Sequence, residues 1–334
     1  MKFNSEDWIQ KTLSSKKKHA LPIITYPGLQ ITGKKVIDLV TNGEAQAACV
    51  AVLASRYSSL AGVMVMDLSV EAESFGSPIK FNDGEIPTVS GRLIKSTEEI
   101  QSLSVPQVGT ARTGEYIRAA SVAASRVTTK PVFGGMIGPY SLAGRLFDMT
   151  EMMMLILTDP DAAHELLKKC TAFLIDYARA YKLAGAAGIV IAEPAAGLLS
   201  ADSCMDFSSV YVKQIVDAVQ DETFIIILHN CGNTVPLVPS MLTTGSAGYH
   251  FGNAVDMMDI LPQIPKNILA FGNLDPVGIF KMADAASVKS KTKLLLERCK
   301  GYNNFVISSG CDVPPGTSLE NIDAFYEAID EFNK

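Results

Sequence analysis

The stretch FIIILHNCG (224–232) decides how this chain is expected to fold. Its five leading apolar residues, rich in isoleucine, predict a buried strand, and the polar cluster after them marks where that strand ends. Each of the similar runs elsewhere in the chain also ends in a polar or turn-forming cluster: LPIITYPG (21–28), GVMVMD (62–67), PVFGGMIGP (131–139), GIVIAEP (188–194), GYHFGN (248–253), ILAFGNLDP (268–276) and NFVISSGCD (304–312). The sequence therefore predicts eight strands with reactive side chains at their carboxyl ends.

Helical patterns separate these runs. Asp159 and Pro160 suit the N-cap and the first position of a helix that continues to Tyr181, and Gly185 follows it. Apolar residues at helical spacing also occur in residues 44–59, 207–220 and 286–299 and in the tail after Ser318. Strands that alternate with helices predict a parallel sheet with right-handed crossovers. We therefore expect the α/β class, as a single (β/α)8 TIM-type barrel over residues 1–334.

One alternative and one irregularity accompany the barrel prediction. A doubly wound open sheet would use the same alternation, but no Gly-rich dinucleotide-binding turn follows a predicted strand. Residues 80–103 contain FNDGEIPTVSGRLI (81–94), which reads as extended chain with turn signals at residues 82–84 and 90–91. We expect this segment to be an insertion between the second and third strands, folded over the mouth of the barrel.

Composition excludes several classes of protein. The chain is 48% hydrophobic and 19% charged with a formal net charge of −6, so it can bury a large core and offers no basic stripe to nucleic acid. Glu6 and Asp7 interrupt the start of the chain and no apolar segment follows, which argues against a signal peptide. The apolar run MMMLIL (152–157) is too short to span a membrane. With six cysteines and no disulfide-scaffold density, the chain is expected in a reducing cytoplasm.

Three side chains at predicted strand ends have the types and the spacing of a metal site. His229 and Cys231 are two residues apart, so they face the same side of their strand, and Cys311 ends the last strand. Parallel strands bring their carboxyl ends to one mouth, and an imidazole with two thiolates selects zinc. Three protein ligands leave an open position on which zinc can activate a thiol or a water. The alternative is that both cysteines are small buried residues and His229 lines the core.

Two acidic residues are candidates for catalysis. Glu193 ends the fourth predicted strand and is interpreted as a fourth metal ligand, a substrate contact or a residue that lines the mouth. Asp67 follows five apolar residues, where an acid is costly unless it is paired or faces a wet cavity. We expect Asp67 to contact substrate or support the site, with capping of the next helix as the alternative.

Candidate binding residues follow two other strands. The turn at residues 138–141, which includes Tyr140 and Ser141, places backbone N–H groups at the start of a predicted helix, where anions bind. Arg145 lies one turn further and either adds a positive charge there or faces solvent. Asn273 is the residue of the GNLDP stretch (272–276) expected to face the cavity, whereas His250 is expected to line the pocket wall.

With these motifs in place, the chain resembles the uroporphyrinogen decarboxylase superfamily over nearly its whole length. The matching stretches are MDLSVEAESFGSPI (66–79), GMIGPYSLAGRL (135–146), LAGAAGIVIAEP (183–194), FGNLDP (271–276) and GCDVPPGTSLENIDAFYEA (310–328). The stretch ITYPGLQITGKK (24–35) has no arginine, unlike the porphyrin-carboxylate motif of the decarboxylases. The pattern of His229, Cys231 and Cys311 is instead similar to that of the methylcobamide:coenzyme M methyltransferase branch.

The resemblance implies a function that the residues alone do not. It implies a zinc-dependent transfer of a methyl group from a methylcobamide, usually carried by a separate corrinoid protein, to a small thiol such as coenzyme M. One alternative is a decarboxylating lyase that uses Asp67 on a carboxylated substrate, against which the missing arginines argue. The other is a non-catalytic, zinc-bearing partner of a corrinoid protein. The sequence predicts neither the acceptor thiol nor the oligomeric state.

Overall fold

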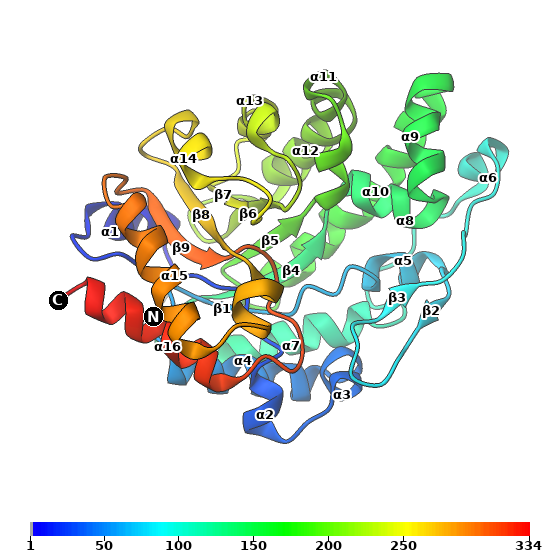
Figure 1. The fold of residues 1–334 in the computed structure, drawn as a ribbon. Helices are drawn as coiled ribbons and strands as arrows, with labels where there is room; N and C mark the ends of the chain where they lie inside the picture. The colour runs from blue at the N-terminus through cyan, green and yellow to red at the C-terminus, as the bar shows by residue number, and fades with distance from the viewer. Residues whose placement is uncertain (1–2) are drawn as a thin grey trace.

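A curled, fully parallel sheet organises the molecule (Figure 1). The structure is a computed structural model that describes residues 3–334. Seven strands lie side by side in the order in which they occur in the chain: β1 (Gly62–Val63), β4 (Val132–Ile137), β5 (Gly188–Ala192), β6 (Ile225–Asn230), β7 (Gly248–Phe251), β8 (Leu269–Leu274) and β9 (Phe305–Ser309). The prediction of an α/β fold with parallel strands is confirmed.

The prediction of a first strand in residues 21–28 is wrong. Residues 21–28 run between β9 and β1 but form no strand. Ala20, just before them, forms two isolated parallel bridges, one to Ser59 and one to Ile307. Pro22 has no amide hydrogen, so a regular ladder cannot continue beyond Ala20. The sheet thus has seven strands, and this single bridging residue joins its two edges in place of an eighth strand.

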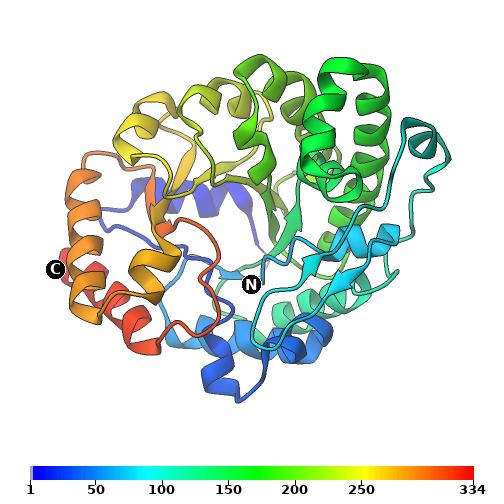
Figure 2. The same ribbon diagram turned by 45° about the vertical axis from the view of Figure 1, so that its right-hand side comes forward.

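Helices surround the sheet, as Figure 2 shows. Their bounds are α1 (Ser5–Ser14), α2 (Gly28–Thr32), α3 (Val36–Thr41), α4 (Gly43–Arg56), α5 (Val70–Phe75), α6 (Thr97–Ser102), α7 (Thr113–Arg126), α8 (Pro139–Phe147), α9 (Met149–Thr158), α10 (Pro160–Leu183), α11 (Ala201–Cys204), α12 (Val210–Val219), α13 (Val238–Leu242), α14 (Met257–Ile260), α15 (Ala285–Arg298) and α16 (Leu319–Phe332). The side chain of Asp159 caps α10 at Ala162, as its position before Pro160 predicts. Within residues 3–334 no helix is both long and apolar enough to cross a membrane.

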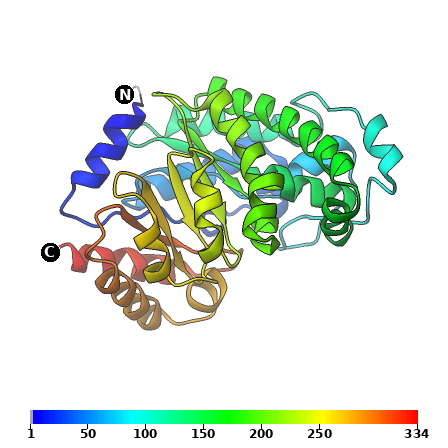
Figure 3. The ribbon, with the colours of Figure 1, turned by 90° about the horizontal axis from the view of Figure 1, so that it is seen from above.

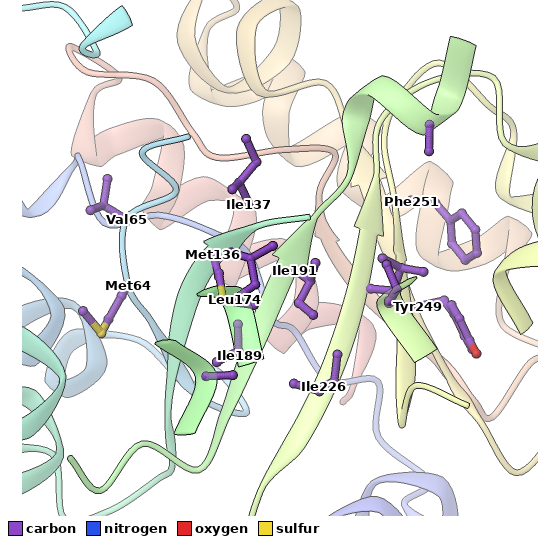
Figure 4. Close-up of a cluster of buried hydrophobic side chains, with 14 of the residues drawn as sticks. Met64, Val65, Met136, Ile137, Leu174, Ile189, Ile191, Ile226, Tyr249 and Phe251 are labelled. Atoms are coloured by element: carbon purple, nitrogen blue, oxygen red, sulfur yellow. The ribbon is translucent and has the colours of Figure 1, made fainter. Parts of the chain in front are cut away.

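The strands bury both faces, and alternate residues supply two separate cores. One core lies between the sheet and the surrounding helices, and Figure 4 shows part of it, including Ile189, Ile191 and Leu174 of α10. The other core fills the inside of the curled sheet and includes Val190, Ala192, Ile225, Ile227 and Val306. Odd-numbered residues of β6 therefore point inward, which sets the direction of the polar residues that follow.

Helix α1 covers the amino ends of the strands and lies at the left edge of the view in Figure 3. Trp8 donates its ring N–H to the carbonyl of Leu60, just before β1, and packs edge-on against Phe133 with ring centroids 5.5 Å apart. Ile9 and Leu13 pack on the same inner core. The amino end of the sheet is thus closed by apolar side chains, and the carboxyl ends of the strands are left for the site.

Residues 79–103 leave the pattern of alternating strands and helices. They form a separate two-stranded antiparallel sheet, β2 (Ile79–Lys80) with β3 (Thr88–Val89), and then helix α6. The backbone N–H groups of Leu93 and Ile94 donate to the carbonyl of Leu146 at the end of α8. The extended segments and turns were predicted from the sequence, whereas the short helix was not.

Candidate metal centre

Strand β6 carries two of the predicted ligands at its carboxyl end. His229 continues the inward series of Ile225 and Ile227, and Cys231 follows just after the strand. Cys311 lies two residues beyond β9. One ligand atom from each of these three residues lies within 4.8 Å of the other two, and no other such cluster of His, Cys, Asp or Glu occurs in residues 3–334. The predicted convergence of His229, Cys231 and Cys311 is therefore present.

The imidazole of His229 leaves one ring nitrogen without a partner. Its Nδ1 lies 2.8 Å from Nδ1 of His250, whose Nε2 lies 2.7 Å from the hydroxyl of Ser308. Nε2 of His229 is buried and has no hydrogen-bond partner within the described part of the chain. A buried polar atom without a partner is costly, and a metal ion would satisfy it. This orphaned nitrogen beside two thiols fits a zinc ion.

The two thiols have pKa values shifted in opposite directions. The neighbouring thiol of Cys311 lowers the pKa of Cys231, against the effect of burial. The same contact with Cys231, together with burial, raises the pKa of Cys311. The two thiols thus differ in acidity, and Cys231 is the one that loses its proton more readily. A cation at this point would displace the thiol protons and stabilise both thiolates.

Glu193 points away from the cluster. It belongs to the outward series of Ile189 and Ile191 in β5, and its carboxylate lies at the start of α8. Both oxygens are bound there: Oε1 accepts from the amide and the hydroxyl of Ser141 at 2.6 and 2.7 Å, and Oε2 accepts from the amide of Tyr140 at 3.2 Å. Burial raises the pKa of Glu193 to about 7, although these bonds oppose the shift. Glu193 is absent from the cluster of ligand atoms.

These bonds also change the interpretation of the turn at residues 138–141. The amides of Tyr140 and Ser141 were predicted to bind an anion, and the anion that they bind here is the chain's own Glu193. A cavity of about 420 Å³ lies next to this helix start; Ser141, Arg145, Pro194 and Leu198 are among its lining residues. Val89 and Gly91 of the 79–103 segment line it too. The exposed Arg145 side chain therefore faces a cavity rather than a flat surface.

Asp67 is buried in an ion network that sequence reasoning missed. Its Oδ2 accepts from Arg112 at 2.5 Å and from the Tyr116 hydroxyl at 3.0 Å, and its Oδ1 accepts from the amide and hydroxyl of Ser69. Arg112 also pairs with Glu73 at 2.5 Å. Arg112 precedes α7 in a stretch without a strand or a helix pattern, so no local signal identified it. Both oxygens of Asp67 are thus occupied by protein groups.

Asp312 and Asn273 complete the set of polar residues at the strand ends. Asp312 accepts at Oδ2 from the amide of Met66 at 3.0 Å, and burial raises its pKa to about 8. The Asn273 side-chain amide donates to the carbonyls of Gly252 and Val255 at 3.0 and 2.7 Å. Its inward position was predicted, but its N–H groups hold the loop after β7. Asp312 stands next to Cys311 in the sequence, and that adjacency was the available signal for it.

The family model described as Uroporphyrinogen decarboxylase (URO-D) matches residues 9–332. The chain belongs to this family. It is 28% identical over 270 residues to the methylcobamide:CoM methyltransferase MtbA of Methanosarcina mazei, covering 80% of this chain and 78% of that one. It is 24% identical over 288 residues to the uroporphyrinogen decarboxylase of Vesicomyosocius okutanii, covering 84% and 81%.

Solved structures support the fold. A methyltransferase from Methanosarcina mazei superposes with a TM-score of 0.88 at 24% identity, covering 99% of this chain and 100% of that one. A B12-independent methionine synthase from Shewanella superposes with a TM-score of 0.56 at 14% identity, covering 95% and 97%. The curled parallel sheet with its ring of helices is therefore an arrangement that this chain shares with known proteins.

Proposed function

We propose that this protein transfers a methyl group from a methylcobamide to a small thiol such as coenzyme M. The observation that carries the proposal is the convergence of His229 Nε2 with the sulfurs of Cys231 and Cys311 at the carboxyl ends of the strands. These three side chains would hold zinc. The likeness to the methylcobamide:CoM methyltransferase of Methanosarcina mazei supports the choice of reaction, and a corrinoid protein is the proposed carrier of the methyl donor.

Zinc held by one imidazole and two thiolates would lower the pKa of a bound substrate thiol toward neutral pH. The chain's own residues would hold the metal in place: β6 and the residue after it position His229 and Cys231, and the turn after β9 positions Cys311. The transfer forms a sulfur–carbon bond as the cobalt–carbon bond breaks, and cobalt keeps the electron pair. We further propose that the remainder of the thiol occupies the cavity beside Ser141 and Arg145.

The other predicted site residues have more limited roles in this proposal. Asp67 and Glu193 were predicted to be catalytic, and Tyr140, Ser141 and Asn273 to bind substrate or cofactor. In the structure the carboxylates of Asp67 and Glu193, the hydroxyl of Ser141 and the side-chain N–H groups of Asn273 bind other protein groups, so a direct role for these groups would require one of these bonds to break. The buried Tyr140 hydroxyl, in contrast, has no hydrogen-bond partner among residues 3–334. We therefore propose that Asp67 and Glu193 hold the walls of the mouth in place, and that the 79–103 segment closes one side of the cavity.

The proposal is tested with methylcobalamin and a thiol under anaerobic conditions. With zinc bound, we expect loss of the methylcobalamin absorbance and the appearance of Co(I) when coenzyme M, homocysteine or another small thiol is added. Protein from which zinc has been removed should be inactive, and added zinc should restore the reaction. Inactivity with every thiol and with a cognate corrinoid protein, together with CO2 release from a carboxylated substrate, would favour the decarboxylase alternative. Inactivity in both assays with zinc retained would favour the non-catalytic partner.

Arg145→Ala is expected to weaken binding of an anionic thiol. Arg145 has an exposed side chain that lines the cavity, and it takes part in no ion pair within residues 3–334, so its guanidinium is available to a ligand. Loss of a hydrogen-bonded charge contact should raise the KM for coenzyme M about 10-fold or more and leave the zinc content unchanged. An uncharged thiol such as 2-mercaptoethanol should show no such change.

A matched control for this prediction is Arg118→Ala. Arg118 has a half-exposed side chain that pairs with Glu44 and Glu115 on the helix surface, so its removal should leave the KM of both thiols unchanged. An equal rise of KM for the charged and the uncharged thiol in the Arg145 variant would show that the arginine shapes the cavity rather than binding the anion.

A further inference from the structure

A chain of three side chains connects the candidate metal ligand to the backbone at the edge of the sheet. Nδ1 of His229 meets Nδ1 of His250 at 2.8 Å, and Nε2 of His250 meets Oγ of Ser308 at 2.7 Å. Oγ of Ser308 lies 2.7 Å from the carbonyl oxygen of Leu21. All three side chains are fully or almost fully buried, so water does not compete for these contacts.

The direction of each hydrogen bond follows from the Leu21 end of this chain. A carbonyl oxygen only accepts, so the single hydroxyl proton of Ser308 must point to Leu21. Two oxygens at 2.7 Å with no proton between them would repel each other. Ser308 therefore accepts from His250, and Nε2 of His250 must carry a hydrogen.

The other nitrogen of His250 must then be free of hydrogen. His250 is 1% exposed, and no carboxylate within residues 3–334 forms an ion pair with it, so a charged imidazolium would be buried without compensation. A neutral imidazole carries a single N–H. Nδ1 of His250 therefore carries a lone pair and no hydrogen, so it can only accept the hydrogen bond that Nδ1–H of His229 donates.

We propose that His250 and Ser308 are positioning residues that fix the proton of His229 on Nδ1 and so present the lone pair of its Nε2 to Cys231 and Cys311. This inference deepens the proposed function, because it rests on the assignment of that cluster as a zinc site. It explains why Nε2 of His229 is the buried nitrogen that has no partner in the described chain. The opposite tautomer would leave two lone pairs facing each other at 2.8 Å and would direct a hydrogen at the metal position.

The ring of His250 is itself held against rotation. It stacks on Phe271 of the inner core with an interplanar angle of 15°, and it meets the His229 ring edge-on at 73°. Phe271, His250 and Ser308 all belong to strands, β8, β7 and β9, whose backbones are fixed by the parallel ladder. The acceptor for His229 is thus part of the rigid sheet, as partners of metal-binding histidines commonly are.

The tautomer can be measured without metal and without substrate. In zinc-free, nitrogen-15-labelled protein, long-range nitrogen–proton correlation spectra should show His229 protonated at Nδ1 and His250 protonated at Nε2. The chain has four histidines, so the signals that disappear in the separate His19, His164 and His250 variants are assigned directly, and the fourth signal belongs to His229. Spectra that show His229 protonated at Nε2 would overturn the inference.

Zinc affinity, measured by competition with a chromophoric chelator, tests the positioning role. His250→Leu should lower the affinity about 10- to 100-fold, because the partner of the ligand is lost. His250→Asn should recover most of it, since its side-chain oxygen is bonded to Cγ as Nδ1 is in histidine. Ser308→Ala should have a smaller effect of the same sign, because His250 is then free to take either tautomer.

The matched control is His164→Leu, the same substitution at a histidine that bonds to the Tyr211 hydroxyl on the outer side of the molecule. It should leave zinc affinity unchanged. Equal affinity of wild type and the folded His250→Leu variant would also overturn the inference. If the tautomer and the affinity series are as expected but no thiol is methylated, the positioning role stands and the proposed reaction fails; the reverse result keeps the reaction and rejects the positioning role.

Discussion

Cys311→Ala is expected to release the bound zinc and to reduce methyl transfer by about three orders of magnitude or more, with the fold intact. Two ligands, His229 and Cys231, would remain, one fewer than the three protein ligands that a catalytic zinc site uses. Cys311 lies beyond the end of β9 and is only partly buried, so its sulfur contributes little to the packing of the core. The measurements are zinc per chain by elemental analysis, the rate of Co(I) formation and the circular dichroism spectrum.

Cys299→Ala is the matched control for this substitution. Cys299 is a free cysteine buried at the end of α15, outside the cluster of ligand atoms. Its replacement should lower the free energy of unfolding by about 1 kcal/mol for the lost apolar contacts and leave the zinc content unchanged. A Cys311 variant that retains one zinc per chain with native affinity would show that the metal is held elsewhere.

The metal cluster was predictable from sequence because its geometry is a property of parallel strands. Residues two apart in a strand share a face, and the carboxyl ends of neighbouring parallel strands share an edge. These two facts place His229, Cys231 and Cys311 together without knowledge of any other contact. The same alternation, once anchored on the inward Ile225 and Ile227, directs Glu193 outward.

The partners of the buried acids were not predictable in the same way. Glu193 meets Tyr140 and Ser141, and Asp67 meets Arg112, through contacts between residues 45 or more positions apart. Such pairs depend on how a helix or a loop packs on the sheet, and no local period encodes that. The missing first strand has a local reason, Pro22, which shows that an apolar run identifies a buried segment more reliably than it identifies a regular strand.

Arg112→Leu is expected to give the largest loss of stability among single substitutions at the mouth, about 3–5 kcal/mol, because it leaves Asp67 buried without its cation. The Arg112 and Asp67 side chains are 8% and 0% exposed, and the guanidinium also bonds to Glu73, to Ser69 and to the carbonyl of Val40. The measurement is the free energy of unfolding by urea denaturation, followed by CD and by tryptophan fluorescence. The chain has one tryptophan, Trp8, so the fluorescence signal comes from a single site.

Two controls, a surface ion pair and a double substitution, show whether the loss of stability comes from the buried charge or from packing. Arg179→Leu removes the same side chain from an exposed pair with Asp176 and should cost less than about 1 kcal/mol. Asp67→Asn combined with Arg112→Leu should be less destabilised than the sum of the two single variants, because no uncompensated charge stays buried. Additive losses would mean that each residue contributes by packing alone.

The ligands of the metal cluster come from β6 and the turn after β9, so all of these variants that remain folded should bind zinc as the wild type does. A loss of zinc in step with the loss of stability would show that Asp67 directly supports the metal site.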